Sequence, residues 1–291
     1  MLEYQCMSIR LIAIDLDGTL LDSSSVISPA NQRALVEAVS RGVQVVVVTG
    51  RRYQSAGPIL KQLRAPVTLI ASNGAMIVSG TGETLYRDFL PRQTALEVLQ
   101  ATPEFRPYAV VIFEVPGRGQ VVMQNGAVPE GPFGWYQRHT PELLRQVEDL
   151  ERVLDTDPIQ VMFGGPPDVV GPLEPFLLGR FKPPGFHLTW TKYLARNLSL
   201  LDVMNRGCTK GRTLAAWAEK LGIAAAEVLA IGDNHNDLEM LRFAGQPVVM
   251  GNCSAGMEQH GWPLTLSNEQ DGVAAAIEEY VFAAGQKSRL P

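Results

Sequence analysis

The sequence predicts an α/β protein whose core is a doubly wound, mostly parallel sheet, interrupted by an inserted α+β cap domain. Apolar runs of strand length alternate with segments of helical periodicity at both ends of the chain. The middle of the chain instead holds most of the 20 prolines, and its apolar runs are shorter and more alternating. A chain of 291 residues is long enough for two domains. We therefore assign residues 1–84 and 192–291 to the core and residues 85–191 to the cap.

The first part of the core is predicted to alternate strands with helices. Leu11-Ile12-Ala13-Ile14 is a continuous apolar run, which is typical of a strand buried on both faces of a parallel sheet. Ser28-Pro29 provides an N-cap and a first-turn proline for a helix that Gly42 ends. Ser72-Asn73-Gly74 is a turn sequence between two strands. The other elements expected here are strands over 43–48, 68–71 and 75–78 and a helix over 55–63.

The cap and the second part of the core are predicted from the same signals. Alternating apolar residues in the cap favour a mostly antiparallel sheet. The expected cap elements are strands over 108–114, 119–124 and 160–163 and helices over 93–100, 141–150 and 169–178. After residue 198 the doubly wound pattern returns. There we expect helices over 212–221, 237–243 and 271–283 and strands over 227–231 and 247–250.

The composition excludes several classes of protein. With 25 basic and 30 acidic side chains, the chain lacks the positive charge that nucleic acids or anionic membrane surfaces attract, so a small ligand is expected. Cys6, Cys208 and Cys253 are scattered and odd in number, which argues against a disulfide framework or a CxxC metal site and favours a reducing, cytoplasmic location. No signal peptide or transmembrane run is recognised, and Met7 is an alternative start.

Two carboxylates follow the first predicted strand directly. Ligands of open α/β sheets bind at the carboxyl ends of the strands, where Asp15 and Asp17 lie. Gly18 lets the chain turn at once, so both side chains can converge on one point. An acidic turn without function is the alternative, because Asp-Gly is a common turn dipeptide. This stretch alone leaves both interpretations open.

Polar groups also end two other predicted strands. Thr49-Gly50-Arg51 follows the strand over 43–48, although Thr-Gly taken alone can simply terminate a strand. Gly232-Asp233-Asn234-His235-Asn236-Asp237 follows the strand over 227–231, and Lys210 begins a helix. Carboxylate oxygens suit Mg²⁺, whereas hydroxyl, amide, ammonium and backbone N–H groups suit phosphate oxygens.

Clustered carboxylates require a compensating charge. Two negative charges about 4 Å apart repel by roughly 4 kcal/mol at an effective dielectric constant near 20. The sequence therefore predicts a Mg²⁺ site at Asp15, Asp17 and Asp233, with the Lys210 ammonium beside it.

These motifs resemble those of a known family. Asp15-Leu16-Asp17-Gly18-Thr19-Leu20, Thr49-Gly50-Arg51, Lys210-Gly211 and the 232–237 segment are similar, in this order, to the four motifs of the haloacid dehalogenase (HAD) superfamily of phosphatases. The cap, inserted between the second motif and the lysine, is similar to that of the Cof-type class IIB members. The resemblance covers nearly all of the core and the cap only loosely.

The resemblance implies a two-step phosphoryl transfer. Asp15 would be the nucleophile that forms an aspartyl-phosphate, and Asp17 would protonate the leaving alcohol and then activate water. Asp15, the backbone carbonyl of Asp17 and Asp233 would hold Mg²⁺. Asp237 would orient Lys210 or a metal-bound water. The residues implied in phosphate binding are Leu16 through its backbone N–H, Thr49, Gly50, Lys210 and Asn236. Further candidates for contact with the substrate or support of the site are Arg51 and Asn73.

The function expected from these residues is Mg²⁺-dependent hydrolysis of a small phosphorylated metabolite, such as a sugar phosphate or a cofactor phosphate. The cap would exclude water and contact the rest of the substrate. A phosphomutase or phosphotransferase on the same core is the nearest alternative, and a non-catalytic phosphometabolite-binding regulator is an alternative of another class. Dehalogenation is disfavoured, because it has no leaving alcohol for Asp17 to protonate.

Overall fold

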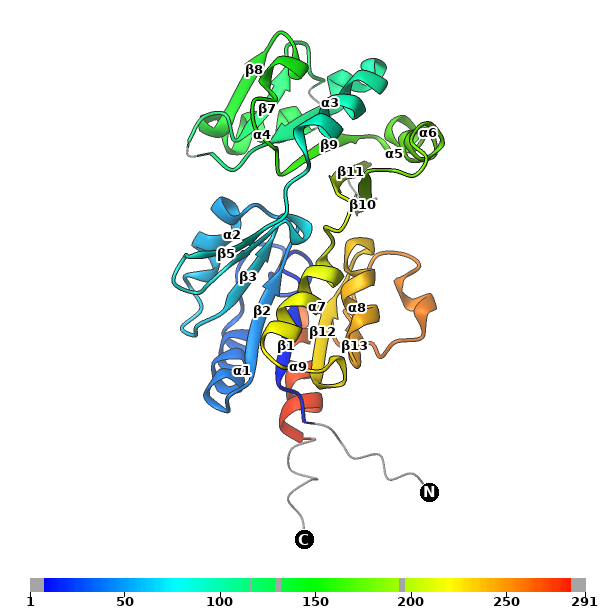
Figure 1. Cartoon of the computed structure of the whole chain (residues 1–291). Coiled ribbons are helices and arrows are strands. Elements are labelled where there is room, and N and C mark those ends of the chain that lie inside the picture. The colour runs from blue at the N-terminus through cyan, green and yellow to red at the C-terminus, as the bar shows by residue number, and fades with distance from the viewer. Residues whose placement is uncertain (1–7, 116, 129–131, 194–196, 284–291) are drawn as a thin grey trace. The chain divides into compact units, whose positions relative to one another are not determined.

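The chain folds into two compact units in a computed structural model, which describes residues 8–115, 117–128, 132–193 and 197–283 (Figure 1). The core unit comprises Met1–Arg87 and Lys210–Pro291, and the inserted unit comprises Asp88–Thr209. The alternative start at Met7 lies outside the described residues. Among the described helices, none has the length and apolar character that crossing a bilayer requires.

The core unit is built on a seven-stranded, mostly parallel sheet (Figure 1). Its strands are β1 (Leu11–Ile14), β2 (Gln44–Val48), β3 (Thr68–Ala71), β4 (Met76–Val78), β5 (Thr84–Arg87), β12 (Val228–Gly232) and β13 (Gln246–Val249). They lie in the order β13-β12-β1-β2-β3-β4-β5, and only the pairs β3–β4 and β4–β5 are antiparallel. The helices of this unit are α1 (Pro29–Ser40), α2 (Tyr53–Leu60), α7 (Lys210–Lys220), α8 (Leu238–Phe243) and α9 (Gly272–Ile277). The predicted fold class is confirmed.

Local sequence signals explain how this sheet and its helices form. All four residues of β1 are fully buried, as expected for a central parallel strand covered on both faces. The Ser28 side chain caps α1 by accepting a hydrogen bond from the Asn31 backbone N–H, and Pro29 occupies the first turn. Gly42 follows α1 with a φ of 86°, a conformation that glycine adopts without strain.

One face of the sheet packs against α7 and α8. Leu11 of β1 and Val46 of β2 belong to a buried cluster with Leu214 of α7 and Met240 of α8. On the other face, Ile12 and Ile14 are also fully buried. Because the sheet is covered on both faces, the polar residues at its strand ends are held on a rigid support.

The inserted unit contains a six-stranded sheet. Its strands are β6 (Ala109–Ile112), β7 (Val121–Gln124), β8 (Leu144–Val147), β9 (Gln160–Gly165), β10 (Phe186–Tyr193) and β11 (Leu198–Asn205), and its helices are α3 (Arg92–Ala101), α4 (Pro132–His139), α5 (Pro167–Val170) and α6 (Leu173–Arg180). The order is β10-β11-β9-β6-β7-β8, and every neighbouring pair except β7–β8 is antiparallel. One face buries Val161 and Leu201 against Leu99 of α3 and Leu177 of α6.

The predicted helix over 141–150 is wrong. A single 3₁₀ turn, Pro141–Leu143, is followed by β8, which pairs with β7. Leu143, Val147 and Leu150 lie at helical spacing, and this spacing favoured a helix. Pairing of β8 with the edge of the sheet prevails over that local pattern. The helix α4 and the strands β5, β10 and β11 have no counterpart in the prediction.

The second boundary between the units also differs from the predicted position at residue 191. The strand β11 pairs with β9 and β10, so it completes the sheet of the inserted unit. The division therefore falls between Thr209 and Lys210. Sequence composition does not reveal this, because the apolar run of β11 is as typical of a core strand as of a cap strand.

Candidate active site

The carboxyl ends of four core strands carry the candidate site. Asp15 follows β1, Thr49 follows β2, the 72–74 turn follows β3, and Asp233 follows β12. Because β12, β1, β2 and β3 are parallel neighbours, their carboxyl ends share one edge of the sheet. Lys210 reaches the same edge from the first turn of α7.

Three buried carboxylates gather there around one ammonium group. Oxygens of Asp15, Asp233 and Asp237 lie within 4.8 Å of one another. The Lys210 Nζ donates to Asp15 Oδ1 at 2.5 Å and to Asp237 Oδ1 at 2.7 Å. The exposed fractions of these four residues are at most 7%. Lys210 and three of the predicted aspartates are therefore brought together in a site that is largely shielded from water.

The carboxylate oxygens of the cluster differ in the hydrogen bonds that they accept. Asp237 Oδ2 accepts from the backbone N–H groups of Asp233 and Asn234, both at 3.0 Å, so both oxygens of Asp237 are occupied. Thr19 Oγ1 donates to Asp233 Oδ1 at 2.9 Å. Within the described part of the chain, Asp15 Oδ2 and Asp233 Oδ2 accept no hydrogen bond from protein. These two oxygens remain as potential ligands.

Burial dominates the electrostatics of this cluster. Loss of hydration, followed by the Asp237 carboxylate, raises the pKa of Asp15 well above its usual value. The same two causes raise the pKa of Asp233 to about 7. Burial opposes the charge of Lys210, but the carboxylates of Asp15 and Asp237 outweigh it and raise the pKa of the lysine. These shifts favour the charged form of Lys210 and the protonated forms of Asp15 and Asp233.

The donor set fits a magnesium ion. Three carboxylates against one ammonium leave two excess negative charges when all are ionised, which a divalent cation would balance. The cluster offers only oxygen atoms, and Mg²⁺ prefers oxygen ligands with one or two carboxylates. Asp15 and Asp233 could supply those two carboxylates, because Asp237 is engaged by Lys210 and by two backbone N–H groups.

Asp17 forms a different contact. Its two carboxylate oxygens accept from Arg51, at 2.7 Å from Nε and 2.5 Å from Nη2. This bidentate pair is half-exposed, and the Asp17 side chain takes no part in the carboxylate cluster that the described residues form. Asp17 therefore has room to act on a ligand, with its orientation fixed by Arg51.

The predicted phosphate-binding residues lie around the strand ends. The Thr49 hydroxyl accepts from the Arg51 backbone N–H at 3.0 Å, which leaves its own O–H to donate. Asn236 Nδ2 donates to Asn73 Oδ1 at 3.2 Å. Across the described ranges, the backbone N–H groups of Leu16 and Gly50 have no protein acceptor. Each of these groups can therefore donate a hydrogen bond to an anion.

Two residues of the first motif contact Asp233, which the sequence analysis did not predict. Thr19 holds Asp233 through its hydroxyl, as described above, and is fully buried. Gly18 adopts a φ of 79°, and a Cβ there would lie 2.6 Å from Asp233 Oδ2. The position of both residues in the Asp15–Leu20 motif was the only sign in the sequence that they belong to the site. Their contact with Asp233 arises only because β1 pairs with β12.

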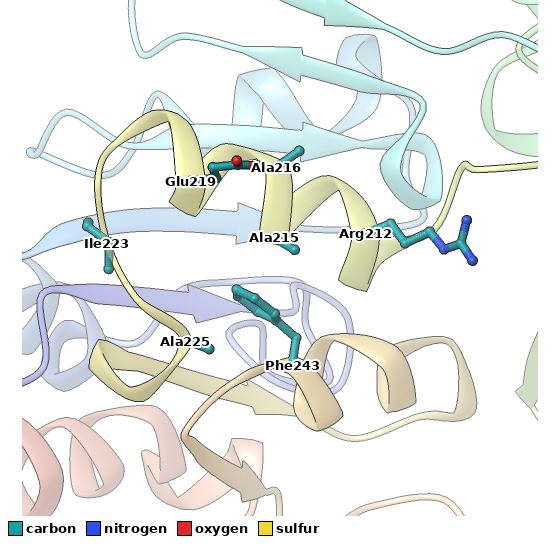
Figure 2. Close-up of a pocket in the computed structure, with 7 residues that line it drawn as sticks. All are labelled: Arg212, Ala215, Ala216, Glu219, Ile223, Ala225 and Phe243. Atoms are coloured by element: carbon teal, nitrogen blue, oxygen red, sulfur yellow. The ribbon is translucent and has the colours of Figure 1, made fainter.

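A shallow pocket elsewhere on the core unit contains none of the predicted site residues (Figure 2). It is lined by Arg212, Ala215, Ala216, Glu219, Ile223, Ala225 and Phe243. Figure 2 shows the Arg212 side chain extending away from the others, so the lining does not converge on one polar point. This pocket is therefore not part of the candidate site at the strand ends.

Comparison with known proteins identifies the family. The model of the haloacid dehalogenase-like hydrolases matches residues 12–277. The chain belongs to this family. As a HAD-family member of the Cof type it is a phosphoric monoester hydrolase, and the predicted family and class of enzyme are confirmed.

Relatives of this HAD phosphatase are named for phosphatase activities. The chain is 33% identical over 244 residues to the HMP-PP phosphatase of Serratia proteamaculans, and the match covers 84% of each chain. It is 27% identical over 287 residues to the pyridoxal phosphate phosphatase YbhA of Escherichia coli, covering 95% of this chain and 100% of that one. A haloacid dehalogenase-like hydrolase from Bacteroides thetaiotaomicron matches its structure with a TM-score of 0.75 and 25% identity, over 93% of this chain and 99% of the other.

Proposed function

We propose that this HAD phosphatase is a Mg²⁺-dependent enzyme that hydrolyses a small phosphorylated metabolite through an aspartyl-phosphate on Asp15. The observation that carries the proposal is the buried group of three carboxylates around the Lys210 ammonium. Its two excess negative charges are unfavourable without a divalent cation. A cation at this position would allow Asp15 to approach a phosphate dianion.

Asp15 is assigned as the nucleophile. Its Oδ atom attacks phosphorus, the bond from phosphorus to the ester oxygen breaks, and the alcohol leaves. Lys210 supports this role because its ammonium donates to Asp15 Oδ1, which fixes the orientation of the carboxylate for in-line attack on phosphorus. Water then cleaves the aspartyl-phosphate, which releases inorganic phosphate and restores the Asp15 carboxylate.

Asp17 is assigned as the general acid and base. Its carboxyl donates a proton to the leaving oxygen in the first step and takes a proton from water in the second. The bidentate contact with Arg51 supports this assignment, because it holds the carboxyl in one orientation while leaving it partly exposed to a ligand. General acid–base catalysis of this kind typically contributes about 10²–10⁴-fold in rate.

The metal and the phosphate are assigned to neighbouring groups. Asp15, Asp233 and the backbone carbonyl of Asp17 would hold Mg²⁺, and the ion supplies positive charge between nucleophile and phosphate. Phosphate oxygens are assigned to the donor set of Leu16, Thr49, Gly50, Lys210 and Asn236. Thr19 and Asp237 keep Asp233 and Lys210 in place.

The substrate class is proposed from the chemistry and the relatives together. The relatives named above are phosphatases of HMP-PP and of pyridoxal phosphate, which are small phosphorylated metabolites. We propose a substrate of that class for this enzyme. Substrate selection by the inserted unit and a cytoplasmic location stay predictions from the sequence.

The test is hydrolysis of p-nitrophenyl phosphate by the full chain. We expect release of inorganic phosphate with Mg²⁺ and none with EDTA. Asp15→Asn should lower kcat by at least ~10³-fold, because the nucleophile is lost. The exposed Asp155→Asn is the matched control and should keep full activity.

Three outcomes would contradict the proposal. Transfer of phosphate to an added alcohol in place of water would favour a phosphotransferase. Absence of turnover with either additive would favour a phosphometabolite-binding protein. Near-normal activity of Asp15→Asn with an unchanged far-UV circular dichroism spectrum would remove Asp15 from the nucleophile role.

A further inference from the structure

The turn after β3 has an unusual backbone. Ser72, Asn73 and Gly74 have φ values of 51°, 53° and 109°, so three consecutive residues lie in the left-handed region. Residues other than glycine rarely adopt this backbone conformation, although asparagine tolerates it better than most. Asn73 is 2% exposed and Ser72 is fully buried. Non-glycine residues in such conformations are retained where surrounding contacts require them.

Hydrogen bonds tie this turn to two elements that carry predicted site residues. Ser72 N–H donates to the Arg51 carbonyl at 2.9 Å, and Asn73 N–H donates to the Thr49 carbonyl at 3.0 Å. Thr213 Oγ1, one turn after Lys210 on α7, donates to the Gly74 carbonyl at 2.9 Å. The backbone of the turn is therefore held by the segment after β2 and by α7. Its left-handed conformation sets the direction of the Asn73 side chain, which contacts Asn236.

The Asn73 amide oxygen contacts two groups of the proposed phosphate site. It accepts the hydrogen bond from Asn236 Nδ2. It also lies over the Cα of Gly50, because a Cβ at Gly50 would be 3.0 Å from it. An asparagine amide carries two N–H donors, so Asn236 keeps a second one beside the contact with Asn73.

We infer that Asn73 is a positioning residue that orients the Asn236 amide toward the transferring phosphoryl group and holds the Gly50 backbone in place. This inference rests on the proposed function. Asn73 acts through Asn236 and Gly50. Its effect on catalysis depends on the Oδ1 acceptor rather than on the conformation of the turn. Donors fixed in advance stabilise charge on the phosphoryl oxygens without reorganisation during the reaction.

The substitution Asn73→Gly separates the side chain from the backbone. Glycine adopts a positive φ without strain, so the turn keeps its conformation while the amide oxygen is lost. We expect kcat/KM for p-nitrophenyl phosphate to fall about 10-fold, and competitive inhibition by inorganic phosphate to weaken by a similar factor. The melting temperature should fall only slightly, because the absence of strain at positive φ offsets part of the lost hydrogen bond and of the greater freedom of glycine in the unfolded chain. Asn197→Gly is the matched control, because exposed Asn197 has a φ of 48° and should keep wild-type kinetics.

A double-mutant cycle tests the route of the effect. In the Asn236→Ala background, Asn73→Gly should have less than a 2-fold further effect, because the partner it positions is absent. A full 10-fold loss in that background would overturn the inference, as would wild-type kinetics and phosphate inhibition in Asn73→Gly itself. If the wild-type enzyme hydrolyses nothing, the proposed function fails; if it turns over and Asn73→Gly matches it, only this inference fails.

Discussion

At the scale of single residues, Asp237 has the most hydrogen bonds within the carboxylate cluster. One oxygen accepts from Lys210, and the other accepts from the backbone N–H groups of Asp233 and Asn234. A buried carboxylate is stable only when such partners satisfy it. Asp237 therefore links the loop after β12 to the first turn of α7, and its negative charge keeps Lys210 protonated.

We expect Asp237→Asn to destabilise the core unit by about 1.5–3 kcal/mol, the usual range for hydrogen bonds to charged groups. The asparagine amide must present an N–H₂ group either to the Lys210 ammonium or to the two backbone donors, so at least one contact becomes repulsive. The measurement is urea denaturation followed by circular dichroism. A midpoint equal to that of the exposed Asp155→Asn variant would contradict this account.

Most of the single residues that sequence reasoning identified follow strand ends, and Lys210 begins a helix. Asp15 and Asp233 were predictable because parallel strands deliver their carboxyl ends to one edge. The hydrogen bond from Thr19 to Asp233 and the contact of Asn73 with Asn236 were not, because each joins residues far apart in sequence. Such contacts depend on the register of strands and the direction of individual side chains, which one sequence does not specify.

At the scale of elements, the close approach of α7 to α8 positions Lys210. A Cβ added at Gly211 would lie 2.5 Å from the backbone carbonyl carbon of Glu239. Only glycine lets the first turn of α7 lie this close to α8, and Lys210 precedes it directly. The helix contact thus sets how far the ammonium reaches toward Asp15.

Gly211→Ala should therefore reduce both stability and activity. Overpacking of this kind typically costs about 1–3 kcal/mol, and displacement of α7 should lower kcat for p-nitrophenyl phosphate. Gly179→Ala in α6 is the control, because its Cβ would meet nothing within 4 Å and alanine favours helix. Thermal melting and steady-state kinetics measure the two effects. Equal melting temperatures for the two variants would show that the helices separate without cost.

Elements were predicted best where local pattern and tertiary pairing agree. The apolar run of β1 and the capped start of α1 needed no long-range information. The 141–150 segment shows the opposite case, because its helical spacing is overridden by pairing of β8 with β7. The end of the inserted unit was misplaced for a related reason, since β11 is recognised as part of that sheet only from its partners β9 and β10.

At the scale of the whole molecule, the excess charge of the cluster links folding to metal and pH. In the metal-free chain, burial and the Asp237 carboxylate raise the pKa of Asp233 to about 7, well above the usual value of 3.8. Between pH 3.8 and about 7, Asp233 therefore keeps a proton in the folded state, whereas the unfolded chain has already released it. The resulting stabilisation is fully present below the unfolded pKa and is lost as pH rises through about 7. The raised pKa of Asp15 acts in the same direction.

Magnesium should reverse this loss. Binding requires ionised carboxylates, so the stabilisation by Mg²⁺ should be small at pH 5.5 and larger at pH 8, where the metal-free cluster carries its full repulsion. Each kcal/mol corresponds to roughly 2–4 °C of melting temperature for a domain of 150–250 residues. Differential scanning calorimetry in EDTA and in excess Mg²⁺ at the two pH values measures the shift. Asp233→Asn removes the titrating carboxyl and one proposed ligand, so its melting temperature in EDTA should depend less on pH and its response to Mg²⁺ should shrink. A shift by Mg²⁺ that is equal at both pH values, or unaltered in this variant, would show that the ion binds elsewhere.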